Sequence, residues 1–60
     1  MSVSDIIAYE MGELSEEATL NMFAVGIKTG LVWSLQGSYG RTARALIESG
    51  AISEDGEVTA

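Results

Sequence analysis

Hydrophobic residues in the middle of the chain recur at the spacing of one helix face. They follow the intervals i, i+3, i+4, i+7 and i+11, at Leu20, Phe23, Ala24, Ile27 and Leu31. This period is typical of an amphipathic α-helix. Ser15 is a favoured N-cap residue, and Gly30 suits the end of the helix because glycine tolerates the left-handed cap. The pattern therefore predicts a helix that begins after Ser15 and ends at Gly30.

A shorter helix is predicted before it, over about residues 3–11. Ser2 can cap this helix, and Gly12 is the expected stop. Ile7 and Met11 lie four residues apart and therefore share one face, with Ile6 and Tyr9 flanking it.

A third helix is predicted over about residues 38–49, with Ser38 as its cap and Gly50 as its end. One face of this helix carries Tyr39, Ala43, Leu46 and Ile47. Residues 31–37 fit either a strand or a short helix. We favour a short helical turn, because helices lie on both sides and a lone strand would have no partner.

These elements predict an all-α fold: one small three-helix domain over residues 1–60, with a short central helical turn. We expect an ordered core over about residues 3–52, with Ile52 folded back onto it. Residues 53–60 are expected to form a mobile acidic tail. Asp55-Gly56 could make a hairpin turn, but two arms this short are only marginally stable.

The amino-acid composition excludes several kinds of binding and catalytic site. The 60 residues include no cysteine and no histidine, which excludes disulfides, zinc fingers and catalysis by a Cys–His or Ser–His pair. No Asp-rich loop resembles a calcium-binding loop. We therefore expect no enzyme activity, no catalytic residues, no metal and no cofactor. The hydrophobic share of 47% is that of a globular chain, and no apolar stretch is long enough to cross a membrane.

Charge is distributed unevenly along the chain. Nine acidic residues and three basic ones give a net charge of −6, and all three bases lie between residues 28 and 47. That basic segment contains residue types enriched at protein interfaces. The candidate partner-binding residues are Trp33, Gln36, Tyr39, Arg41 and Arg44. An alternative stays open, in which Trp33 and Leu35 are core residues and Tyr39 is a neighbour of Trp33.

Three other readings remain. The third helix and the turn at Glu54–Glu57 are reminiscent of a winged helix, but an acidic wing and so few bases argue against nucleic-acid binding. Met22 and Val25, if exposed, would favour a homodimer through the second helix or another protein partner. A structural, self-assembling virion component is the last alternative. We expect no membrane binding, because interfacial helices favour a basic polar face.

Three segments of the chain resemble a family of small phage-encoded proteins of unknown function. These segments are Ile6-Ile7-Ala8-Tyr9-Glu10-x-Gly12-Glu13-Leu14, Gly30-Leu31-x-Trp33-x-Leu35-Gln36-Gly37-x-Tyr39-Gly40-Arg41-x-Ala43 and Leu46-Ile47-Glu48-x-Gly50. The resemblance implies a phage origin, hence the cytoplasm of the infected bacterial host, and implies no activity. Residues 21–27 depart from the more acidic helix associated with the family. We expect an accessory protein that binds and modulates a host protein.

Overall fold

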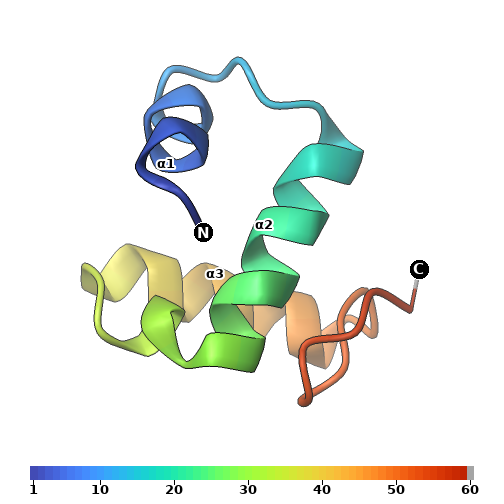
Figure 1. Ribbon diagram of the computed structural model, residues 1–60. Helices are drawn as coiled ribbons and strands as arrows, with labels where there is room; N and C mark the ends of the chain where they lie inside the picture. The colour runs from blue at the N-terminus through green and yellow to red at the C-terminus, as the bar shows by residue number, and fades with distance from the viewer. Residues whose placement is uncertain (60) are drawn as a thin grey trace.

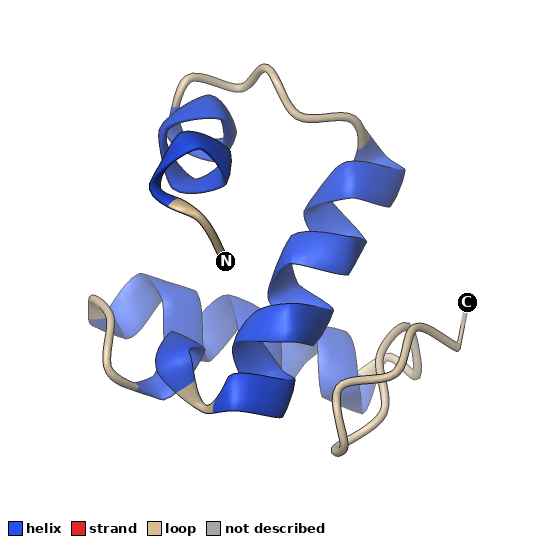
Figure 2. Ribbon diagram, viewed as in Figure 1, coloured by secondary structure: helices blue, strands red, loops and turns tan. Residues whose placement is uncertain are grey.

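The computed structural model describes residues 1–59, which contain three α-helices and one 3-10 turn. The helices are α1 (Val3–Glu10), α2 (Glu16–Thr29) and α3 (Gly37–Glu48), and the 3-10 turn η1 (Leu31–Trp33) joins α2 to α3 (Figures 1 and 2). The predicted all-α class, the three helices and the central helical turn are confirmed. Figure 1 shows α1 beside the N-terminal half of α2, while α3 crosses the C-terminal half.

Hydrogen bonds at the helix ends explain where α1 and α2 begin and stop. The hydroxyl of Ser2 accepts a bond from the Asp5 amide, and that of Ser15 accepts one from the Ala18 amide, each at 3.1 Å. Gly30 has a φ of 81° and donates its amide to the Ile27 carbonyl. The third helix differs from prediction at its start, because its N-cap is Gln36 rather than Ser38 and makes no side-chain capping bond.

An aromatic cluster joins the three helices. Tyr9 of α1, Phe23 of α2 and Tyr39 of α3 contact one another, with ring centroids 5.4 to 6.1 Å apart. Edge-on and tilted contacts of this kind add to the free energy gained by burying the rings. Phe23 is completely buried at the centre. The other buried core residues are Met22, Ala24, Ile27, Val32, Tyr39, Ala43 and Ile52.

The outward faces of the first two helices differ from the prediction in detail. Ile7 and Met11, which share a face of α1, are 53% and 66% exposed, whereas the flanking Ile6 and Tyr9 pack against the core. Met22 is buried, so of the two residues whose exposure would favour a contact through α2, only Val25 is exposed. A spacing of four residues identifies which side chains share a face, but it does not tell which apolar face of a helix turns inward.

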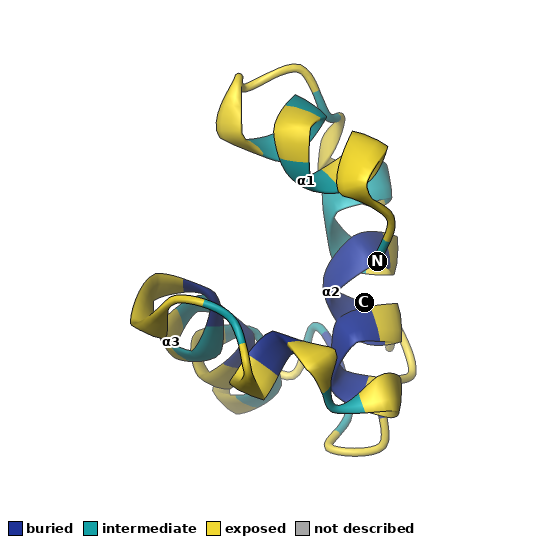
Figure 3. Cartoon of the chain, turned by 60° about the vertical axis from the view of Figure 1, so that its left-hand side comes forward, coloured by how far each residue is buried: buried dark blue, intermediate teal, exposed yellow. Residues whose placement is uncertain are grey.

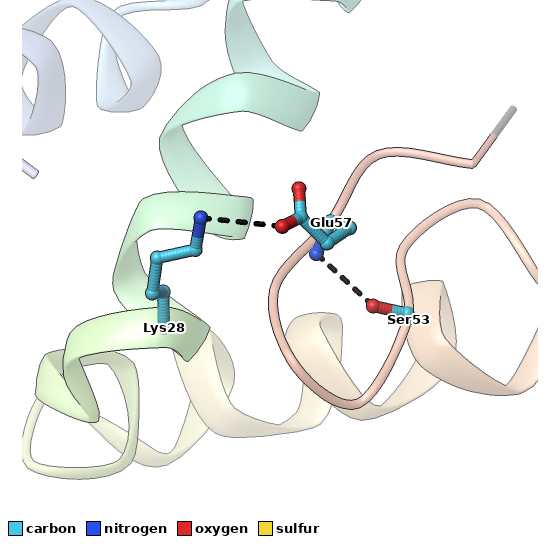
Figure 4. A network of polar contacts seen from close by, with 3 residues as sticks. All are labelled: Lys28, Ser53 and Glu57. Atoms are coloured by element: carbon cyan, nitrogen blue, oxygen red, sulfur yellow. Dashed lines mark hydrogen bonds and ion pairs between the residues drawn. The ribbon is translucent and has the colours of Figure 1, made fainter.

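The largest difference lies at the C-terminus, where residues 53–59 form a folded turn and not a mobile tail. An antiparallel bridge pairs Ile52 with Val58, and the Ser53 amide donates to the Glu57 carbonyl at 2.7 Å. Lys28 of α2 forms an ion pair with Glu57 at 3.5 Å, and the Ser53 hydroxyl accepts from the Glu57 amide (Figure 4). Ile52 folds onto the core as predicted. Residue 60, also assigned to the tail, lies outside the described residues.

Gly56 explains why this acidic segment can pack closely. Its φ is +89°, a conformation that favours glycine, and a Cβ at this position would lie 2.6 Å from the Ala24 carbonyl oxygen. The turn therefore lies directly on the backbone of α2. A pattern of acidic residues alone does not reveal this contact, because the contact depends on the missing side chain of one glycine.

Candidate protein-binding surface

Trp33 lies where η1 ends and is 48% exposed. Part of its ring rests on Gly40 of α3, since a Cβ at Gly40 would lie 3.6 Å from the Trp33 Cε3 atom. Phe23, not Trp33, occupies the centre of the core. The interpretation of Trp33 as the main core anchor is therefore wrong, although Leu35 does pack against the core. The indole is held on α3 while much of it stays accessible to a partner.

Arg41 and Arg44 are exposed residues of α3, the helix on which the Trp33 ring rests. Arg44 follows Gly40 by four residues and so lies on the side of α3 that carries Trp33. The guanidinium of Arg41 extends back over Gly37, where a Cβ would lie 3.1 Å from Nη1. Within residues 1–59, neither arginine forms an ion pair or a side-chain hydrogen bond, whereas Lys28 is engaged by Glu57. Both guanidinium groups are thus free to bind a carboxylate.

Gln36 adds a neutral polar group to the same segment. It is exposed at the N-cap of α3, and its side chain makes no capping hydrogen bond. Its amide can therefore donate to and accept from a partner. We call the four exposed residues Trp33, Gln36, Arg41 and Arg44 the Trp33 surface.

Tyr39, the fifth candidate residue, has a different environment. It is buried in the aromatic cluster, and its hydroxyl donates to Glu10 Oε2 at 2.5 Å. This hydrogen bond, together with burial and the nearby carboxylate charge, raises the pKa of Tyr39 to about 12. The structure therefore places Tyr39 among the residues that join α1 to α3 and not on the exposed Trp33 surface.

An apolar groove on another side of the molecule was not identified from the sequence. It has a volume of about 440 Å³, and its lining residues are Leu14, Glu16, Thr19, Leu20, Leu46 and Ala51. We call it the leucine groove. It lies between the start of α2 and the end of α3, so its residues are far apart along the chain. The groove could be predicted only by knowing how α2 and α3 pack against each other.

The outer face of α1 is a second apolar feature that the sequence did not reveal. Val3, Ile7 and Met11 are exposed there, and α1 contributes no buried residue to the core (Figure 3). The spacing of these residues was visible in the sequence, but their exposure depends on how α1 is rotated against α2.

No group of three or more acidic side chains within residues 1–59 is placed to hold a metal ion. In the same part of the chain, no helix is long and apolar enough to span a membrane.

The fold and its surface define a small all-α domain that presents a half-exposed tryptophan, packed on α3, and two arginines of the same helix that form no ion pair within the described residues. The chain belongs to the family described as domain of unknown function DUF7417, which matches residues 2–60. No curated protein and no solved structure matches the chain significantly.

Proposed function

We propose that this chain is a phage-encoded, non-enzymatic accessory protein that binds and modulates a host protein. It would act in the cytoplasm of the infected bacterium. The observation that carries the binding role is the Trp33 surface, where an accessible indole rests on α3 and two exposed arginines of that helix form no ion pair within residues 1–59. The phage origin and the host partner rest on the resemblance of the three sequence segments.

The Trp33 surface has the composition of an interaction hot spot. Tryptophan and arginine are the residue types most enriched at such sites, and a rigid anchor loses little side-chain entropy on binding. The contact of the indole with Gly40 provides that rigidity. A partner that offers an apolar cleft edged by carboxylates would bury Trp33 and pair with Arg41 and Arg44.

Nucleic-acid binding is the second candidate, favoured by one observation. A folded turn with a β-bridge follows α3, as the wing follows the recognition helix in a winged-helix domain. The turn carries Glu54, Asp55 and Glu57, however, and these charges would face phosphates. Arg41 and Arg44 provide little compensation for these acidic charges, so protein binding accounts better for the charge distribution. Self-assembly, including assembly within a virion, is the third candidate.

Affinity capture from a bacterial host lysate tests the proposal. Tagged wild-type protein should retain one specific host protein, which Arg41→Ala/Arg44→Ala should lose while keeping its helical circular dichroism. Glu54→Ala/Asp55→Ala serves as the matched control, because it also removes two exposed charges. Capture that persists without both arginines would contradict the proposed surface. A salt-sensitive shift of duplex DNA at ~50 mM salt would favour the second candidate instead.

A further inference from the structure

We propose that the leucine groove is a docking site for the Trp33 surface of a second copy of this chain. The protein would then self-associate through two different surfaces, one apolar with an acidic edge and one aromatic with a basic edge. This inference does not depend on a host partner, because both surfaces belong to the chain itself.

The leucine groove has the properties expected of a socket for a large apolar side chain. Its volume of about 440 Å³ lies in the range of ligand-binding clefts. Leu14, Leu20 and Leu46 are only partly buried, so the groove presents apolar surface that water now covers. Burying such surface against a partner is favourable.

The edge of the groove is negatively charged. Glu16 lines it directly. A neighbouring hollow of about 520 Å³ shares Glu16 and Leu20 with the groove and adds Glu17 and the partly exposed Val58. The lining of this second hollow is mixed, because Asn21 and the two carboxylates accompany Leu20 and Val58, so the apolar groove continues into an acidic margin. Within residues 1–59, neither carboxylate pairs with a cation.

The Trp33 surface has the opposite arrangement. Trp33 is an accessible apolar group, and Arg41 and Arg44 are the two cationic side chains that form no ion pair within the described residues. The complementary charges select the orientation, since the arginines would meet Glu16 and Glu17 when the indole enters the groove. Other apolar parts of this chain match the groove less well, because the exposed face of α1 is accompanied by acidic residues.

The contact must form between two molecules. Leu46 lines the groove and follows Arg44 by two residues, which places the two side chains about 160° apart around α3. A rigid helix cannot bring its own opposite sides together. Because the two surfaces lie on opposite sides of α3, the contact is head-to-tail, and further copies would add in one direction to form a ring or an open chain.

Self-association would also occupy the surface that we assign to the host partner. The two events would therefore compete, and the free monomer would be the form that binds the host protein. This competition provides a way to separate the two proposals experimentally.

Sedimentation equilibrium of the full chain, from about 10 µM to about 1 mM, tests the docking. The average mass should rise above that of one chain with concentration, and less so at ~500 mM salt, where exposed charges are screened. Arg41→Glu/Arg44→Glu and Glu16→Lys/Glu17→Lys should each weaken association by at least about tenfold, because like charges would then face each other. An equimolar mixture of the two variants should associate again. Glu54→Lys/Asp55→Lys, which reverses two charges outside the groove, should associate like wild type.

Several results would overturn the inference. The wild type could stay monomeric up to about 1 mM. Alternatively, the arginine variant, whose changes lie at exposed positions, could associate normally, or the mixture could fail to recover. Association lost in Ile7→Gln but kept in the arginine variant would assign the contact to α1. The host capture experiment remains independent, because Glu16→Lys/Glu17→Lys retains the Trp33 surface and should still bind the host protein.

Discussion

Replacement of Gly56 by alanine is the sharpest perturbation of the folded C-terminal turn. The glycine has a φ of +89° and lies directly on α2. An added Cβ would approach the Ala24 carbonyl oxygen to 2.6 Å and the Lys28 amide nitrogen to 2.8 Å. Both atoms belong to the backbone of a helix, so neither can move aside without disturbing α2.

Two contributions determine how much Gly56→Ala should lower the free energy of unfolding. A left-handed conformation costs a residue with a Cβ about 1–2 kcal/mol. Overpacking of a close contact adds typically about 1–3 kcal/mol. Gly56→Ala should therefore destabilise the protein by about 2–5 kcal/mol, unless the turn detaches from α2 at lower cost. For 60 residues the whole free energy of unfolding is about 3–9 kcal/mol, so the effect is large.

Gly50→Ala provides the matched control. Gly50 has a φ of +84°, and a Cβ there would have no atom within 4 Å. It should therefore cost only the conformational contribution of about 1–2 kcal/mol. Urea unfolding followed by circular dichroism measures both variants. Equal destabilisation of Gly50→Ala and Gly56→Ala would refute the close contact between the turn and α2.

Further outcomes follow from the core and the Trp33 surface. Phe23→Ala should lower the free energy of unfolding by about 3–5 kcal/mol in urea titrations, and unchanged stability would contradict its central place in the core. Tyr39→Phe should cost about 1.5–3 kcal/mol by removing the hydrogen bond to the Glu10 carboxylate. Because the folded protein raises the pKa of Tyr39 from 10.0 to about 12, the unfolded chain loses this proton first. The stabilisation by Tyr39 should be complete below pH 10 and should disappear between pH 10 and about 12. When the free energy of unfolding is measured against pH, Tyr39→Phe should not show this decrease. Arg41→Ala/Arg44→Ala should leave the thermal midpoint nearly unchanged, since both side chains are exposed and unpaired within residues 1–59; a large drop would assign them a structural role.

Local signals in the sequence were sufficient to place the helices. Ser15 and Gly30 are recognisable as helix ends because capping chemistry acts between residues a few positions apart. The buried positions of α2, notably Phe23 and Ile27, follow from its periodicity for the same reason. The all-α class could therefore be predicted without knowledge of any long-range contact.

Long-range packing accounts for the features that the sequence did not reveal. The ion pair of Lys28 with Glu57 joins residues far apart in the chain, and the turn that allows it depends on Gly56. Met22 is buried and Ile7 exposed because of how α1 and α2 are rotated, which periodicity leaves undetermined. The leucine groove exists only where α2 and α3 meet.

The sequence predicts which residue types the candidate surface contains, but it does not predict which of these residues are exposed and which are buried. The aromatic and basic residues of the central segment are visible in the sequence, and interface statistics single them out. The sequence does not tell whether Trp33 or Tyr39 is the buried residue, since both are aromatic residues of the same glycine-containing segment, residues 30–40. The structure separates them: Trp33 lies on Gly40 and stays accessible, whereas Tyr39 reaches into the core toward Glu10.

The most direct test of the binding role measures the affinity of the captured host protein for two matched variants. One is Arg41→Ala/Arg44→Ala, and the other is Ile7→Gln/Met11→Gln, which changes the exposed apolar face of α1. We predict a loss of at least about tenfold for the arginine variant and near wild-type affinity for the α1 variant. The opposite result, with affinity lost only when α1 is changed, would contradict the Trp33 surface as the site of partner binding.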